Sequence, residues 1–166
     1  MGWVRLGALL FGMALVGSCG ADAAAGPRER IGQPVEVSVA TSPVLATLWV
    51  ESIRPVTCTE PGSLPPSRGH YLAVTIVLKA SPQYEPHWGW WVSAQDFSTV
   101  DADGEETGRG LQTSCLPPAD FLRDEAYMAG SGYQGIILVD TADESGTLSY
   151  SPDNLPAQRE GWLWDY

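Results

Sequence analysis

The sequence predicts an all-β domain that follows a short N-terminal export segment. The chain has 18 glycines and 13 prolines, and residues of these two types favour turns over long helices. Between them lie short runs that are β-branched, aromatic or alternating in polarity, which is typical of strands. About 148 residues follow the first 18, a length that suits one domain.

The export segment is an apolar run from Leu6 to Val16, preceded by Arg5. A run of this length suits a secretory signal peptide and is too short to cross a hydrocarbon core of about 30 Å. Gly17, Ser18 and Cys19 follow it, an ending that resembles the bacterial lipobox. The resemblance implies that residues 1–18 are a signal peptide and that Cys19 carries diacylglycerol. The alternative is a plain secretory peptide in which Cys19 is incidental.

Lipidation at Cys19 predicts a protein anchored to the outer face of the cell membrane, since acyl chains hold a soluble domain there. Residues 19–30 would include the lipidated cysteine and a flexible tether rich in small residues. The formal net charge of −11 becomes about −12 without Arg5. Such a charge excludes nucleic acid as a partner and leaves the lipid as the link to the membrane.

The first half of the domain, which we expect over residues 31–166, contains three predicted strands. Residues 35–40 alternate apolar and polar side chains, as in a half-buried strand. Residues 44–53 form a second strand between prolines, and residues 57–69 a loop. Residues 71–80 form a nearly continuous apolar run, which indicates a central strand buried on both faces.

The second half contains five more predicted strands. Residues 90–100 lead into Asp103-Gly104, a tight-turn signal, from which residues 105–112 would pair back. Residues 113–131 form a long connection with a short helix near 119–128. The remaining strands are predicted at residues 132–141, 146–151 and 161–166.

Seven or eight short strands separated by turns are the pattern of an immunoglobulin-like β-sandwich, and an eight-stranded barrel is the competing architecture. The order IGQPVEV, YLAVTIVLKA, DFSTVDADGEE, GYQGIILVDTADESGTLSYSP and GWLWDY resembles the secreted immunoglobulin-like domains of actinobacteria. These are lipoproteins and antigens grouped under a domain of unknown function. The resemblance covers residues 31–166. It implies a β-sandwich, export and no assigned catalytic residue.

Two cysteines remain once Cys19 is assigned to the lipid. Cys58 and Cys115 can form only one intramolecular disulfide in an oxidising compartment. The alternative is a pair of free thiols in a soft-metal site, for which the Cys-x-x-Cys spacing is absent.

The stretch from His87 to Trp91 is the candidate ligand-binding surface. His87, Trp88, Trp90 and Trp91 bring three indoles within four residues, and clustered aromatic rings can stack on sugars or grip a peptide. Alternation along a strand instead places Trp91 in the core and Trp90 at a sheet edge. Trp162, Trp164 and Tyr166 are expected to pack in the core.

Catalytic and metal motifs are absent from the sequence. Asp101 to Glu106 could offer oxygen ligands to Ca²⁺, but a solvated turn explains the same residues. His70 and His87 lack a third zinc ligand at a recognisable spacing, and no nucleophile motif occurs. We therefore expect no enzyme, no metal and no cofactor.

The function expected from these observations is binding or scaffolding in the cell envelope, with an envelope protein or a glycan as partner. Two alternatives stay open. One is a carbohydrate- or cell-wall-binding module that uses Trp88, Trp90 and Trp91, and the other is a secreted hydrolase.

Overall fold

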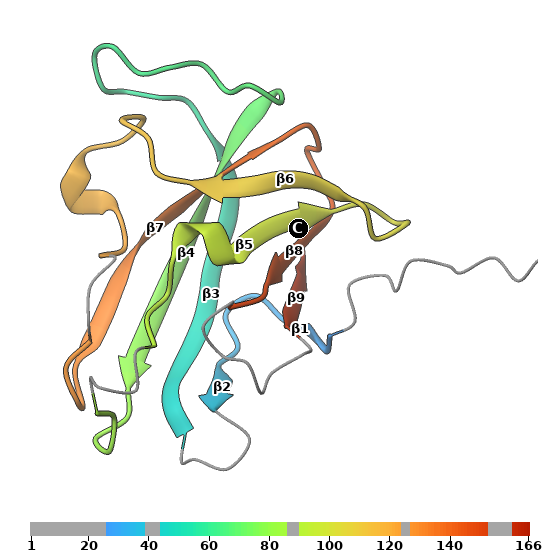
Figure 1. Ribbon diagram of the computed structural model, residues 1–166. Helices are drawn as coiled ribbons and strands as arrows, with labels where there is room; N and C mark the ends of the chain where they lie inside the picture. The colour runs from blue at the N-terminus through green and yellow to red at the C-terminus, as the bar shows by residue number, and fades with distance from the viewer. Residues whose placement is uncertain (1–25, 39–43, 86–89, 124–126, 153–160) are drawn as a thin grey trace, which may run out of the picture.

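The computed structural model describes residues 26–38, 44–85, 90–123, 127–152 and 161–166. In this part of the chain, nine strands form one hydrogen-bonded sheet, in the spatial order β1-β9-β8-β5-β6-β7-β4-β3-β2 (Figure 1). β1 runs parallel to β9, and all other neighbours are antiparallel. The strands are β1 Arg28–Glu29, β2 Val35–Ser38, β3 Val44–Val56, β4 His70–Ala80, β5 Phe97–Val100, β6 Glu106–Leu111, β7 Gly132–Thr141, β8 Thr147–Tyr150 and β9 Trp162–Asp165.

The sheet folds over on itself at β7. This strand pairs with β4 along Lys79↔Gly132 to His70↔Thr141, but it pairs with β6 only from Gly108↔Thr141 to Leu111↔Leu138. β2, β3, β4 and β7 therefore form one layer, and β6, β5, β8 and β9 pass over it as the second (Figure 1). The predicted all-β sandwich is confirmed, with a barrel-like closure because one continuous sheet supplies both layers.

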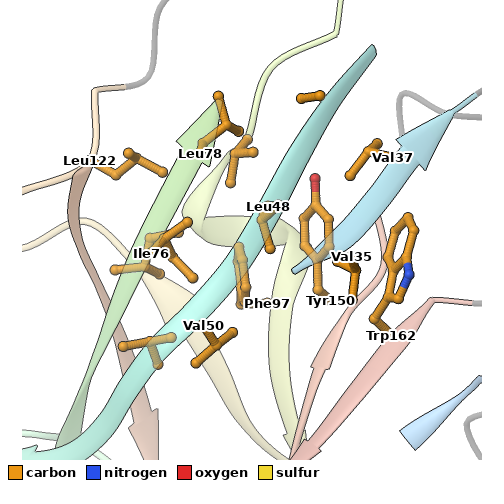
Figure 2. Packing of buried hydrophobic residues seen from close by; sticks show 14 of the residues in the cluster. Val35, Val37, Leu48, Val50, Ile76, Leu78, Phe97, Leu122, Tyr150 and Trp162 are labelled. Atoms are coloured by element: carbon orange, nitrogen blue, oxygen red, sulfur yellow. The ribbon is translucent and has the colours of Figure 1, made fainter. Parts of the chain in front are cut away.

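The main core lies between the two layers. Alternating side chains of β2, β3 and β4 point inward, because successive residues of a strand face opposite sides. They meet Phe97 from β5, Tyr150 from β8 and Trp162 from β9 (Figure 2). Phe97 stacks on Tyr150 with ring centroids 4.6 Å apart, and Tyr150 stacks on Trp162 at 5.6 Å. The expected core packing of Trp162 and Trp164 is confirmed, since both side chains are buried, and Tyr166 is partly buried against the same core.

A second, smaller core covers the outer face of β4 and β7. Tyr71, Ala73 and Leu138 point away from the main core and pack with Cys115 and Leu116. The connections that follow β3 and β6 supply the cover. β4 is therefore central and buried on both faces, as its apolar sequence predicts.

Three segments differ from the predicted elements. The strand expected over 90–100 is a strand only over Phe97–Val100, because Ser93 caps a 3₁₀ turn at Ala94–Asp96. The helix expected near 119–128 is wrong as far as it is described: a 3₁₀ turn spans Pro118–Asp120, and Phe121 is extended. Residues 124–126 lie outside the described part.

The third difference lies at the N-terminal edge. Arg28–Glu29, which we expected within the tether, pairs with β9 and so belongs to the sheet. The Arg28 guanidinium pairs with Asp165 and also donates a hydrogen bond to Thr147 Oγ1. No helix among residues 26–166, apart from the gaps in that range, is long and apolar enough to cross a membrane.

Candidate functional site

The proline-rich connection of residues 57–69, called here the flap, is fastened to the domain at several points. The Cys58–Cys115 disulfide predicted from the sequence is present and joins the flap to the connection after β6. Beside it, Thr59 N donates to Cys115 O over 3.0 Å. Ser63 Oγ also donates to Ser114 O over 2.8 Å. One end of the flap is therefore held by a covalent bond and hydrogen bonds together.

Asp140, in β7, holds the other end of the flap. The residue is 7% exposed, and its carboxylate accepts three hydrogen bonds, from Ser67 N at 2.8 Å, Ser67 Oγ at 2.5 Å and Arg68 N at 3.0 Å. Burial raises the pKa of Asp140, but these hydrogen bonds and the Arg68 charge outweigh it and lower that pKa below its usual value. The ionised carboxylate is therefore the form that fastens the flap.

A cavity of about 470 Å³ opens between the flap and the sheet. Its floor combines residues of both hydrophobic cores, so it lies where the two cores meet. The volume falls within the roughly 300–1,000 Å³ usual for small-molecule sites. The lining residues are Glu60, Pro61, Val92, Ala94, Leu111, Gln112, Thr113, Ser114, Leu116, Pro118, Phe121, Leu122, Ile136 and Ile137.

The cavity exists because β6 ends early. After Leu111 the backbone separates from β7, and its next backbone pairing with that strand is an isolated bridge between Phe121 and Ile136. There Leu122 N donates to Ile136 O over 3.0 Å. Gly135 permits this approach, because a Cβ at that position would overlap the Leu122 backbone. Between the end of the β6–β7 pairing at Leu111 and the bridge at Phe121, apolar side chains of the interior therefore face an opening.

The lining of the cavity is mostly apolar with a polar rim. Aliphatic side chains and the Phe121 ring form its walls, while Gln112, Thr113 and Ser114 offer hydrogen-bonding groups. Among the described lining residues, Glu60 is the only charged one. Such a lining can take up an apolar body and orient it through a few polar contacts.

A second, more polar hollow continues from the first. Ala94, Leu111 and Gln112 line both. The second hollow also includes Arg109, whose guanidinium pairs with the Glu106 carboxylate through NH2–Oε2 at 2.8 Å and Nε–Oε1 at 3.2 Å. The basic group next to the cavity is therefore already engaged by an acid.

The tryptophan surface predicted from the sequence is not formed as expected. Trp90 is fully buried and packs against Tyr84 and Tyr127, with ring centroids 6.3 and 5.6 Å away. Trp91, which we placed in the core, is 41% exposed. The prediction for these two side chains is therefore wrong. It assumed that residues 90–100 form one strand with alternating faces, whereas the strand begins only at Phe97. His87 and Trp88 lie outside the described residues.

The other candidate sites have structural roles. Asp101 Oδ1 accepts hydrogen bonds from Asp103 N and Glu105 N, both at 2.9 Å, and so stabilises the tight turn before β6. His70 Nε2 lies 2.6 Å from Asp143 O. Within the described ranges, no three His, Cys, Asp or Glu side chains lie close enough together to hold a metal ion.

Sequence reasoning missed the cavity. It placed the disulfide and the long connections correctly, but it gave no sign that β6 would separate from β7 at Leu111. The run of polar residues Gln112–Ser114 between Leu111 and Cys115 was the available signal.

Comparison with known proteins shows similarity in fold. No family model matches the sequence, and the curated proteins give no significant match. The secreted protein MPT63 of Mycobacterium tuberculosis matches with a TM-score of 0.62 and 17% identity, over 85% of this chain and 98% of that one. The yjhA protein of Bacillus subtilis matches with a TM-score of 0.53 and 11% identity, over 82% and 97% of the two chains.

A third similar structure is ycdA from Bacillus subtilis, named as a proposed lipoprotein. It matches with a TM-score of 0.50 and 14% identity over 79% of this chain. The present chain spans only 38% of ycdA. At these identities the three structures establish the fold that this chain shares with them: an all-β sandwich like that of MPT63.

Proposed function

We propose that the protein is an extracytoplasmic, lipid-anchored binding module of the cell envelope, and that its ligand site is the cavity under the flap. The export segment, followed by Gly17, Ser18 and Cys19, supports the anchor. The Cys58–Cys115 disulfide supports an oxidising compartment, because such bonds persist outside the cytoplasm. One structural neighbour is described as secreted and another as a proposed lipoprotein.

The observation that carries the proposal is the construction of the cavity. An apolar hollow in a small domain is costly, because its lining forfeits contacts that a filled core would make. Here the flap, which contributes Glu60 and Pro61 to the wall, is fastened by the disulfide beside them and by the Asp140 carboxylate at its other end. A wall held this firmly keeps the hollow open and preformed, as small-molecule sites usually are.

Binding fits this site better than catalysis does. Glu60 is the only carboxylate among the described lining residues, whereas a glycoside hydrolase would need a facing pair. The resemblance to actinobacterial immunoglobulin-like domains also implies no catalytic residue. A carbohydrate module built on the indoles is less well supported, since Trp90 is buried.

A titration with a neutral apolar probe tests the proposal. We would add 1-octanol to the mature chain carrying Cys19→Ser, so that no attached lipid competes, and follow backbone amide shifts by NMR. Saturable shifts should concentrate at Leu111, Leu122 and Ile136. Thr113→Phe should abolish them by filling the cavity, while Thr57→Phe, an exposed flap position outside the lining, should not. Absence of saturable shifts at these three amides would contradict the proposed site.

A further inference from the structure

The charge on the lining of the cavity would distinguish between ligands of similar shape. Its body is aliphatic and aromatic, and its one charged lining residue in the described part of the chain is Glu60, which is half-buried in the flap. The Glu60 backbone carbonyl, rather than its carboxylate, accepts the hydrogen bonds of the local turn, from Ser63 N at 3.2 Å and Ser63 Oγ at 2.5 Å. Glu60 is therefore the residue through which the described lining of the cavity carries a negative charge.

The residues around the cavity and the net charge of the chain add to this negative character. The adjoining hollow contains Arg109, but Glu106 engages that guanidinium through two contacts. The chain as a whole carries a formal charge of −11, with Lys79 as its single lysine. The field of the protein therefore favours the approach of cations and opposes that of anions.

Building on the proposed function, we infer that the cavity binds small hydrophobic amines, with the apolar body between the two cores and the protonated amine at the Glu60 carboxylate. Fatty acids and other apolar anions are excluded in this assignment, because they would bring a second negative charge to the same rim. A neutral molecule of the same shape would bind more weakly than the amine, since it lacks the ion pair.

A partly exposed ion pair contributes modestly, about 0.2–1 kcal/mol. The expected preference for the amine over a neutral analogue is therefore roughly 1.4- to five-fold in Kd. The preference over an anion should be larger, because attraction is replaced by repulsion.

Three probes of equal chain length separate these cases: octylammonium, 1-octanol and octanoate. Each would be titrated at neutral pH and low salt against the mature Cys19→Ser chain, with Kd taken from the amide shifts of Leu111, Leu122 and Ile136. The inference requires octylammonium to bind most tightly and octanoate most weakly. In Glu60→Gln, the advantage of octylammonium over octanol should vanish, so that the two Kd values become equal. Thr113→Phe should remove binding of all three probes.

The outcomes separate this inference from the proposed function. If octanol binds but octylammonium binds no more tightly, the amine assignment is overturned and the cavity remains a binding site. If none of the probes binds, both are overturned. A dimer that Thr113→Phe converts to a monomer, measured by light scattering, would assign the cavity to a second copy of the chain and overturn the amine assignment.

Discussion

At the scale of single residues, Asp140 shows how a buried carboxylate can organise a loop. Its oxygens accept two backbone N–H groups and one hydroxyl from Ser67 and Arg68. Hydrogen bonds to a charged acceptor are stronger than those between neutral groups. They fix the backbone at the end of the flap, where the chain turns into β4.

Replacing Asp140 by Asn should destabilise the protein by about 1.5–3 kcal/mol at neutral pH, because two or more charge-assisted hydrogen bonds weaken. The folded-state pKa of Asp140 lies below its unfolded value of about 3.9. Its contribution is therefore complete above that unfolded value and is lost as the pH falls through the lowered folded pKa. Urea denaturation at pH 7 and pH 3 measures both effects.

The Asp103→Asn variant is the matched control, since Asp103 is exposed in the turn before β6. It should change the free energy of unfolding by less than about 0.5 kcal/mol. A difference between wild type and Asp140→Asn that stays constant between pH 7 and pH 3 would contradict the role assigned to the ionised carboxylate.

Trp90 and Trp91 show where the sequence pattern misleads. Alternation along a strand places adjacent side chains on opposite sides. It identifies the side that faces the core only when the first residue of the strand is known. Here the strand begins only at Phe97, after the 3₁₀ turn capped by Ser93. The aromatic neighbours of Trp90, Tyr84 and Tyr127, come from loops that no local pattern identifies.

Truncation of these two indoles should therefore have unequal effects. Trp90→Ala removes a fully buried ring and should cost about 3–5 kcal/mol. Trp91→Ala removes a partly exposed ring and should cost less than about 1 kcal/mol. Equilibrium urea unfolding of the two variants provides the measurement. Equal losses, or the larger loss at Trp91, would show that the packing described here is wrong.

At the scale of elements, the flap is a long connection made rigid by its attachments. It has no strand or helix of its own, yet Cys58, Ser63 and Ser67 each bind a different partner in the rest of the domain. The sequence predicted the loop and the bridge, because only two cysteines remained to pair. It could not predict the Asp140 contacts, which join residues more than 70 positions apart.

Removing the disulfide should lower stability substantially. Cys58 and Cys115 are 57 positions apart, and closing a loop of that length contributes about 4 kcal/mol in the chain-entropy model. The Cys58→Ser, Cys115→Ser double variant should therefore melt well below the wild type in calorimetry. It should also bind octanol more weakly, because one end of the cavity wall is released.

Reduction of the wild-type protein is the matching control and should reproduce the shift in Tm, whereas the reductant should leave the double variant unchanged. An unchanged Tm after complete reduction, verified by alkylation of both thiols, would contradict a stabilising role for the bridge.

At the scale of the whole molecule, the sequence predicts the architecture better than the site. Strands such as β4 and β7 are long, apolar and bounded by turn residues, so their local pattern agrees with their final place in the sheet. The cavity depends instead on where β6 and β7 separate, and on Gly135 allowing a distant backbone to approach. Such pairings over long sequence distances are not encoded in any short stretch.

The N-terminal segment is expected to fix where the whole molecule resides. If Cys19 is acylated, two or three buried chains hold the domain at the membrane almost permanently, since each CH₂ contributes about 0.8 kcal/mol. Cys19→Ser should then shift the protein from the membrane fraction to the medium, or leave it unprocessed with residues 1–18 attached. Cell fractionation with mass spectrometry of the N-terminal peptide measures this, and the Cys58→Ser, Cys115→Ser variant, which keeps Cys19, should stay with the membrane. A mature wild-type N-terminus without lipid would refute the anchor.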